Sequence, residues 1–437
     1  MLKKNTYHNV TVTDMNDLGY GVARIDGIVV FVDGGVTGDE LEIKIIKAAK
    51  DYGVARTEKI ITPSPYRVSP DCAVFPRCGG CSFRHISREY ELELKRNIVV
   101  SAFRKNGIDA KVGKVLTDGK VSGYRNKAQY PIDENGNIGY YARHSHTVIP
   151  CDKCDLTAPE LSEIASFVSD YIKSKKWCVK HIYLRIAEKT GQIMTCLVTP
   201  NESLDGEKEF AEELTARFPN VVSVLLNIHP EETNVILGKK TECAIGQDYI
   251  EEDLLNKTFK ISSNTFFQVN PKSAENIFNY VKDFIQANYE KPIVLDAYAG
   301  ISTFGICLSD VAKKVVTVEE VKASTDLASK IIKENGIKNV EIHNMDAGKF
   351  FEKELNTKGR SFDVTVLDPP RKGCTQESLD YALKLTKGKI IYVSCNPATL
   401  ARDLKYLVEK GCKVEFIQPF DMFPHTYHIE NVAVISI

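Results

Sequence analysis

Short apolar stretches separated by glycine turns dominate the first 60 residues. Their spacing predicts four or five short strands, with Gly34, Gly35 and Gly38 in the turns between them. The expected strands lie near Val10–Val12, Gly19–Val22, Ile28–Val32, Leu41–Ile45 and Tyr52–Ala55. Strands of this length and spacing are typical of a small OB-type barrel, a fold that often binds nucleic acid through one sheet face. We therefore expect an OB-like domain at residues 1–60, followed by a proline-marked linker.

The middle of the chain mixes helical and strand patterns. Apolar side chains at Tyr90, Leu94, Ile98 and Phe103 share one face of a helix that is predicted over 87–106. Further elements are expected at Leu161–Ser174 (helix), His181–Ile186, Ile193–Val198 and Val221–Asn227 (strands). We assign 61–260 to a central α+β domain, although its helix at 87–106 could instead pack on the C-terminal domain.

From about Asn270 the pattern becomes strand, turn and helix in repetition. Such alternation predicts a parallel, doubly wound α/β sheet over 261–437, with the strands in the order 3-2-1-4-5. The expected strands are Ile293–Leu295, Val315–Val318, Val340–His343, Val364–Leu367, Ile390–Val393 and Asn431–Ile437.

Composition limits the classes of partner. The 437 residues include 57 Lys and Arg against 58 Asp and Glu, so overall basicity cannot drive nucleic-acid binding. One segment, Arg77–Lys127, carries twelve basic against five acidic residues. This segment is either a solvated helix face or a patch that contacts phosphates. The N-terminus lacks the apolar stretch of a signal peptide and no apolar run is long enough to span a bilayer, so we expect a soluble cytoplasmic protein.

Acidic residues follow the predicted parallel strands in the way expected of a nucleoside site. A glycine turn follows the first strand at Tyr298–Ser302, and Ser302 stands where a second glycine is usual. Glu319, about 20 residues on, could accept from ribose hydroxyls, and Asp346 could accept from an exocyclic amine. The pattern indicates a Rossmann-like nucleoside-binding fold.

A cysteine and two carboxyls complete the chemistry of this region. The predicted strand order places Asp296, Asp368 and Cys395 on one carboxyl-end rim. Cys395 precedes a helix that Thr399 could cap, so we expect the pKa of its thiol to be lowered. Glu430 follows later as a candidate general base.

Three spaced motifs resemble those of the RNA uracil-5-methyltransferases: DPPRKG at 368–373, IIYVSCNPAT at 390–399 and FPHTYHIE at 423–430, joined by FQVN at 267–270. The resemblance covers nearly the whole chain. The N-terminal region resembles a TRAM domain, and CAVFPRCGGC at 72–81 resembles the iron–sulfur motif of the 23S ribosomal RNA members. The resemblance implies a class I S-adenosylmethionine methyltransferase domain at 261–437.

The resemblance also implies a mechanism that forms 5-methyluridine. The thiolate of Cys395 adds to uracil C6, C5 takes the methyl group of S-adenosylmethionine, and Glu430 removes the C5 proton. The implied cofactor residues are Gln268, Tyr298, Glu319 and Asp368, to which we add Asp346 from its position alone. The turn Ala299–Ser302 departs from the Cys-Gly-x-Gly that is common in the family.

The expected substrate is 23S ribosomal RNA, and the alternative is transfer RNA. Bacterial transfer RNA enzymes of the simple kind lack both the barrel and the cysteine loop, which favours the ribosomal substrate. The target base must be flipped out of folded RNA to reach the thiol. Within Tyr124–Lys127, which resembles a family stretch near the RNA, we expect Arg125 to contact RNA. We expect a monomer, because RNA is the partner.

Three thiols at Cys72, Cys78 and Cys81 need a fourth ligand to hold a metal. The family pattern implies Cys154, with Cys151 as its competitor. Four thiolates can hold zinc or an iron–sulfur cluster, and spacing does not separate the two. The resemblance favours a [4Fe–4S] cluster with a structural or RNA-positioning role, since methyl transfer needs no electron.

Two other classes of protein share features with this chain. Radical methylthiotransferases also join a TRAM-like barrel to cysteines, but theirs follow a C-x3-C-x2-C spacing, whereas this chain has C-x5-C-x2-C ahead of a Rossmann-like fold. A non-enzymatic RNA-binding protein could keep the fold, but the presence of both Cys395 and Glu430 argues against it.

Overall fold

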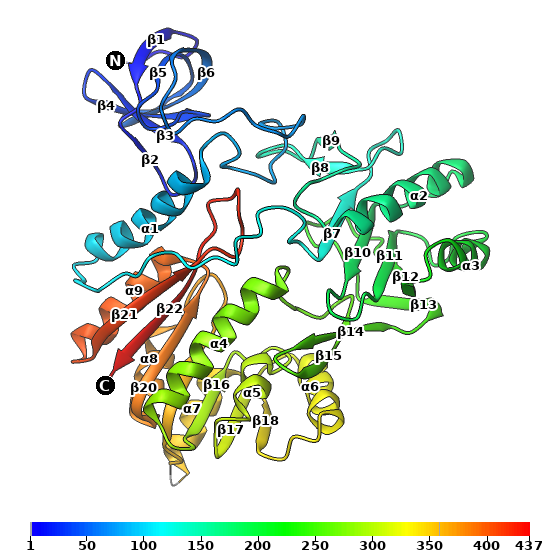
Figure 1. Cartoon of the computed structure of the whole chain (residues 1–437), viewed down its shortest axis with the longest axis vertical. Coiled ribbons are helices and arrows are strands. Elements are labelled where there is room, and N and C mark those ends of the chain that lie inside the picture. The colour runs from blue at the N-terminus through cyan, green and yellow to red at the C-terminus, as the bar shows by residue number, and fades with distance from the viewer. Residues whose placement is uncertain (1, 358) are drawn as a thin grey trace.

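The computed structural model describes residues 2–357 and 359–437. Figure 1 shows three β-regions that follow one another along the chain, with the N-terminal strands at one end and the C-terminal sheet at the other. The N-terminal region is a six-stranded sheet in the order β1-β5-β6-β4-β3-β2. Its strands are β1 (Tyr7–Thr11), β2 (Asp14–Met15), β3 (Gly21–Ile25), β4 (Ile28–Asp33), β5 (Glu40–Ala48) and β6 (Tyr52–Thr62).

A long helix follows the cysteine loop. Helix α1 (Arg88–Lys105) begins at Ser87, whose side chain accepts from the backbone N–H of Tyr90. Acidic residues in its first turn and Arg104 and Lys105 in its last turn both suit the helix dipole. The helix predicted from the apolar spacing is confirmed.

The central region is a five-stranded sheet in the order β13-β12-β11-β10-β7, flanked by two hairpins. Its elements are β7 (Lys127–Pro131), β8 (Gly139–Tyr141), β9 (Val148–Pro150), α2 (Pro159–Lys175), β10 (His181–Ile186), β11 (Ile193–Thr199), α3 (Glu207–Arg217), β12 (Val221–Ile228), β13 (Lys240–Gly246), β14 (Tyr249–Leu254) and β15 (Lys257–Ser262). The three predicted strands and the helix of this region are all present.

The C-terminal region is a seven-stranded sheet in the order β18-β17-β16-β19-β20-β22-β21. Strands β16 to β20 are parallel, and β22 and β21 run antiparallel to their neighbours. Its elements are α4 (Pro271–Asn288), β16 (Ile293–Ala297), α5 (Thr303–Leu308), β17 (Lys314–Glu319), α6 (Lys322–Glu334), β18 (Val340–Asn344), α7 (Ala347–Asn356), β19 (Phe362–Leu367), α8 (Gln376–Leu385), β20 (Thr386–Ser394), α9 (Pro397–Glu409), β21 (Lys413–Phe420) and β22 (Glu430–Ser436).

The predicted strand order 3-2-1-4-5 is confirmed for β16 to β20. The prediction omitted β21, which contains Pro419. A proline cannot donate to a sheet ladder, and this one is tolerated because β21 is the edge strand. The cap of α9 is also different from the one expected. Asn396 accepts from the N–H groups of Ala398 and Thr399, and the Thr399 hydroxyl instead donates to the carbonyl of Arg371 at 3.1 Å.

Helix α1 packs on the C-terminal region through apolar and charged contacts. Val99 and Phe103 join the same buried cluster as Leu400 and Leu404 of α9. Beside this cluster the fully buried Lys95 ammonium lies 3.0 Å from Glu91 Oε1 and 2.5 Å from Asp421 Oδ1. Arg88 pairs with both carboxylates, so two positive and two negative charges meet in the interior.

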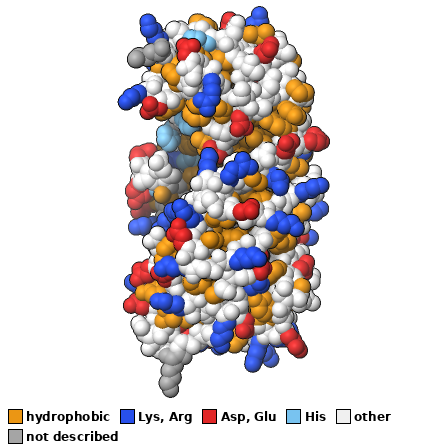
Figure 2. Space-filling model, turned by 90° about the vertical axis from the view of Figure 1, so that its left-hand side faces the viewer, with side chains coloured by type: hydrophobic (Ala, Val, Ile, Leu, Met, Phe, Trp, Pro, Cys, Tyr) orange, Lys and Arg blue, Asp and Glu red, His pale blue; other side chains and the backbone are white. Residues whose placement is uncertain are grey.

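Surface charges are interspersed. Lys, Arg, Asp and Glu side chains alternate over the face that Figure 2 shows, with hydrophobic side chains between them. None of the helices among the described residues combines the length and apolarity that crossing a bilayer requires.

The buried charges generate a stability prediction. Replacing Lys95 by Met leaves two buried carboxylates opposed by Arg88 alone, so we expect unfolding free energy to fall by about 3–5 kcal/mol. The matched control is Lys322→Met, which breaks the exposed pair between Lys322 and Asp326 and should cost less than about 1 kcal/mol. Urea titrations of the two variants measure both values. Similar small losses would show that the buried pairs do not hold α1 in place.

Candidate active site

The carboxyl ends of the parallel strands form one rim, as the predicted topology requires. Glu319 ends β17, and its carboxylate accepts from the backbone N–H groups of Gly300 and Val321 at 2.9 and 2.8 Å. The bond to Gly300 fixes the turn after β16 against the end of β17. The rim is therefore preorganised at the place where such sheets bind ligands.

Ser302 adopts the left-handed backbone conformation that explains why glycine is common at this position. Its φ is +61°, and Tyr298 and Gly300 in the same turn also have positive φ angles. The Ser302 hydroxyl donates to Thr317 Oγ1 at 3.0 Å, which compensates for the less favourable backbone conformation. The substitution keeps the turn that a second glycine would make.

Asp296 at the end of β16 carries a polar atom without a partner. Oδ2 accepts from the Gly305 N–H at 2.8 Å, whereas Oδ1 is buried and has no hydrogen-bond partner. Burial, with smaller effects of Asp368 and Glu319, raises the pKa of Asp296 to about 8. A buried carboxylate oxygen without a partner, beside a glycine turn, fits a site for a ligand that donates hydrogen bonds or carries positive charge.

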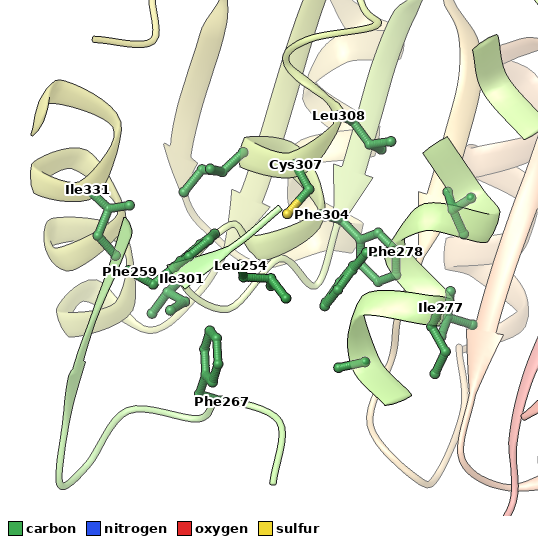
Figure 3. Close-up of a cluster of buried hydrophobic side chains, with 14 of the residues drawn as sticks. Leu254, Phe259, Phe267, Ile277, Phe278, Ile301, Phe304, Cys307, Leu308 and Ile331 are labelled. Carbon is green, nitrogen blue, oxygen red and sulfur yellow. The ribbon is translucent and has the colours of Figure 1, made fainter. Parts of the chain in front are cut away.

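Gln268 lies in the loop that precedes α4. Figure 3 shows Phe267 pointing into a buried cluster that includes Phe259 and Ile301. Arg185 donates to the Phe267 carbonyl at 2.8 Å, and the Asn126 N–H donates to the Val269 carbonyl at 2.9 Å. The loop is thus anchored on both sides of Gln268, whose own side chain is only partly buried.

Two of the three remaining predicted cofactor residues, Asp346 and Tyr298, already have intramolecular contacts. Asp346 follows β18 and caps α7, accepting from the Lys349 N–H at 3.0 Å. Tyr298 packs in part against the buried cluster that contains Cys374 and Leu379, on the α8 side of the rim. Glu319, Asp346 and Asp368 lie on the rim, and the Tyr298 ring packs beside it, toward α8.

Cys395 and Glu430 are brought together by strand pairing. Strand β22 runs antiparallel to β20, with Asn431 opposite Ser394. Cys395 follows Ser394 and Glu430 precedes Asn431, so the two side chains start from adjacent backbone positions although 35 residues separate them in sequence. Cys395 and Glu430 are each partly buried. A thiol and a carboxyl therefore share one edge of the sheet.

Burial governs the ionisation of this pair. It raises the pKa of Asp368 to about 7 and, with the help of Asp368, raises the pKa of Glu430 to about 8. The expectation of a lowered pKa for Cys395 is wrong. Burial and the Glu430 carboxylate raise the pKa of that thiol, and they outweigh the opposing effect of Arg371. The helix that follows Cys395 does not offset the rise in the pKa of the thiol that burial and the Glu430 carboxylate cause.

Arg371 and His428 are site residues that the motif reading did not single out. The Arg371 guanidinium is the cation that opposes the rise in pKa at both Cys395 and Glu430. It also lies 3.4 Å from Nδ1 of His428. Burial lowers the pKa of His428 to about 4, so the ring is neutral and can accept from Arg371. The sequence does offer a signal for Arg371, because this residue lies in the DPPRKG motif that also contains Asp368.

Cys395 opens into a cleft of ≈ 840 Å³. One wall is the N-terminal turn at 14–18, a second is α1, and the third combines 395–398 with 427–429. The cleft lies within the size range of ligand-binding pockets. Three separate parts of the chain thus surround the access to the thiol.

A second cavity, of ≈ 220 Å³, collects the clustered thiols. Its lining includes the four predicted ligands Cys72, Cys78, Cys81 and Cys154, and also Cys151. Burial raises the pKa of Cys81 to about 11 against the opposing effect of Arg84. Within residues 2–357 and 359–437, no three His, Cys, Asp or Glu side chains converge in a way that could hold a single metal ion.

Arg125 lies at this cavity, where it lines the wall with Arg84. Its guanidinium is 5.8 Å from the centre of the Tyr124 ring, and its Nε is buried without a partner. Other cations of the basic segment are also internal, among them Lys95 and Arg84. Six of the twelve cations of the segment are exposed: Arg77, Arg104, Lys105, Lys111, Lys114 and Lys120.

Comparison with known proteins assigns the family. The family model described as tRNA (uracil-5-)-methyltransferase matches residues 88–436, and the TRAM domain model matches residues 2–57. Uncharacterized RNA methyltransferases from Clostridium tetani and Listeria innocua are 38% and 37% identical to this chain. Each alignment covers 100% of this chain, with 97% and 99% of the respective relative.

A solved structure extends the likeness to three dimensions. The tRNA (uracil-54, C5)-methyltransferase of Pyrococcus abyssi, in complex with S-adenosyl-L-homocysteine, has a TM-score of 0.80 and is 25% identical. The alignment covers 98% of this chain and 100% of that one. With its TRAM domain, its doubly wound sheet and these relatives, the chain is an RNA methyltransferase that belongs to the tRNA (uracil-5-)-methyltransferase family.

Proposed function

We propose that the protein methylates C5 of a uridine in 23S ribosomal RNA through a covalent intermediate on Cys395. The observation that carries this proposal is the pairing of β20 with β22, which brings the backbone of Glu430 next to that of Cys395, whose side chain lines a large cleft. A nucleophile and a separate base within reach of one substrate are what C5 methylation of a pyrimidine requires.

Cys395 and Glu430 act at different steps of the proposed reaction. The Cys395 thiolate forms a bond to uracil C6, which turns C5 into a nucleophilic enolate carbon. S-adenosylmethionine supplies the methyl group that C5 takes. The Glu430 carboxylate then accepts the C5 proton, the electrons of that C–H bond restore the C5–C6 double bond, and the C6–S bond breaks to release the thiolate. Arg371 opposes the raised pKa values of both groups, and so favours the ionised forms that each step needs.

The rim residues fit the methyl donor. We infer that Glu319 accepts from its ribose hydroxyls and that Asp346, Asp368 and Gln268 line the remainder of its site. The unpartnered Oδ1 of Asp296 supports a ligand that forms a hydrogen bond at this rim. Support also comes from the S-adenosyl-L-homocysteine bound to the Pyrococcus abyssi enzyme. We propose that Tyr298 contacts the methyl donor from the turn that follows β16, since its ring packs toward α8.

Two RNA classes remain candidates, and each has its own support. The cysteine loop at 72–81 resembles the motif of the ribosomal RNA members, which favours 23S ribosomal RNA. Transfer RNA is favoured by the Pyrococcus abyssi enzyme, which acts at uracil 54 of transfer RNA and shares this architecture along its whole length. Since that enzyme matches almost all of this chain, the presence of the N-terminal strands does not discriminate between the two substrates.

We propose that the cysteine cavity holds a [4Fe–4S] cluster through Cys72, Cys78, Cys81 and Cys154. Four thiolates surround such a cluster at its corners, whereas the ligands of a zinc ion converge on one atom. The cavity of ≈ 220 Å³ is lined by all four of these thiols, as a cluster bound at its corners requires. The buried and unpartnered Nε atoms of Arg84 and Arg125 add positive charge beside the thiols, which suits an anionic group.

The nucleophile is tested by Cys395→Ala. We expect methyl transfer from labelled S-adenosylmethionine to 23S ribosomal RNA to fall by roughly 10⁴-fold or more, because the covalent route is lost. Binding of S-adenosylmethionine, measured by calorimetry, should stay unchanged. Cys178→Ala removes an exposed cysteine elsewhere and should keep the wild-type rate. Methylation near the wild-type rate in Cys395→Ala would contradict the mechanism, and wild-type methylation of transfer RNA alone would change the substrate.

The cluster is tested by comparing Cys154→Ser with Cys151→Ser. Protein purified without oxygen should be brown, with about four iron atoms per chain. We expect Cys154→Ser to lose most of this iron and Cys151→Ser to retain it, because Cys151 is the spare thiol whose Sγ donates to the Lys153 carbonyl at 3.2 Å. A colourless wild-type protein that contains zinc would refute the cluster, and the reverse pattern in the variants would exchange the fourth ligand.

A further inference from the structure

The segment Asp421–Ile429 connects β21 to β22 and ends at Glu430. It has no regular secondary structure over most of its length. Five consecutive backbone carbonyls at its start, 421 to 425, nevertheless each accept a hydrogen bond from a group outside the segment. The donors are Ser273 Oγ to 421, Asn270 Nδ2 to 422, Lys95 Nζ to 423, Tyr124 Oη to 424, and the backbone N–H groups of Ser82 and Phe83 to 425.

These donors come from four different parts of the chain. Asn270 and Ser273 belong to the start of α4, Lys95 to α1, Tyr124 to the stretch before β7, and Ser82 and Phe83 to the end of the cysteine loop. Figure 1 shows the same convergence, with the red segment rising from the C-terminal sheet toward α1. No carbonyl in this run depends on the sheet that carries Glu430.

His425 is the point at which the cysteine loop holds the segment. Its carbonyl accepts from Ser82 and Phe83 at 2.8 and 3.0 Å, and its N–H donates to Glu91 Oε1 at 2.7 Å. Its φ is +65°, a conformation that a non-glycine residue keeps only when its surroundings determine it. Cys81, one of the proposed cluster ligands, directly precedes Ser82.

Side-chain packing reinforces the same joint. Phe83 is fully buried in a small cluster with Met15 of the N-terminal sheet and Leu94 of α1, and Tyr427 packs against this cluster. Tyr427 and its neighbour His428 line the cleft that contains Cys395. The end of the cysteine loop is thus in contact with the segment at His425 and again at Tyr427.

We propose that the cysteine loop is a positioning element for Glu430, which it holds through the carbonyl of His425. The inference rests on the proposed function, because it assigns the loop to one step of that reaction. Cys395 is carried by β20 and α9, and neither element accepts a hydrogen bond from the cysteine loop. Loosening the loop should therefore slow removal of the C5 proton more than formation of the bond to Cys395.

This difference gives the test its readout. If proton removal alone slows, the methylated RNA stays attached to Cys395, and a covalent protein–RNA complex accumulates on unmodified RNA. A purely structural defect slows both steps and leaves no such complex. Denaturing gels measure the complex, and release of tritium from C5-labelled uridine measures proton removal.

Tyr124→Phe tests whether the segment positions Glu430 without altering the cysteine loop, because it deletes only the hydroxyl that donates to the carbonyl of Pro424. The matched control is Tyr183→Phe, which removes another buried hydroxyl, one that has no partner. We expect tritium release by Tyr124→Phe to fall roughly tenfold, a part of the ~10²–10⁴-fold that a positioned base contributes. The covalent complex should accumulate with Tyr124→Phe and not with Tyr183→Phe.

The loop itself is tested by Cys81→Ser and by removal of metal from the wild-type protein with a chelator. Hydrogen exchange, followed by mass spectrometry, should show faster exchange of the amides of 425–430, while those of β20 keep their protection. Unchanged exchange at 425–430, or loss of protection in both regions together, would overturn the proposal. Wild-type protein that forms no covalent intermediate would refute the proposed mechanism instead, and the exchange result would still decide whether the loop holds the segment.

Discussion

The buried charges around Lys95 are the constraint on which the rest of the structure depends. Lys95 and Glu91 lie one turn apart on α1, and Lys95 pairs both with Glu91 and with Asp421, which is more than 300 residues away in sequence. Burial of a lone charge is costly, so each of these groups requires the others. The helix can dock on the C-terminal sheet in one register only, and that docking fixes the start of the segment that leads to Glu430.

The active site follows from this docking and from the topology of the sheet. Parallel strands bring Glu319, Asp368 and Cys395 to one rim, and the antiparallel return of β22 places Glu430 beside the thiol. The N-terminal turn and α1 then form the opposite walls of the cleft. The proposed nucleophile, base and methyl-donor site thus belong to one sheet, whereas the N-terminal turn and α1 shape the access to them.

The rim could be predicted from sequence because it depends on local patterns. Alternating strands and helices determine a strand order, and the order determines which strand ends become neighbours; Glu319 and Cys395 were located in this way. Contacts between distant segments leave no such pattern. In the sequence, Lys95 is one of several charged residues in the predicted helix. Its pairing with Asp421 is known only from the folded structure.

One sequence expectation about the chemistry of the site changes with the fold. A helix start lowers the pKa of an exposed thiol, but burial and the approach of Glu430 reverse the direction at Cys395, and neither can be read from local sequence. Arg125 lies in a stretch that resembles a region near RNA, and its side chain lines the cysteine cavity. Its contact with RNA stays a prediction.

The central claim is that Cys395 forms a covalent bond to a uracil of 23S ribosomal RNA, and trapping that bond tests it most directly. Fluorine at C5 cannot leave as a proton does, so RNA that contains 5-fluorouridine should remain attached after methyl transfer. With S-adenosylmethionine present, we expect a complex that survives denaturation, and mass spectrometry should locate the RNA on the peptide that contains Cys395. No complex from protein that binds S-adenosylmethionine, or attachment at another cysteine, would contradict the account.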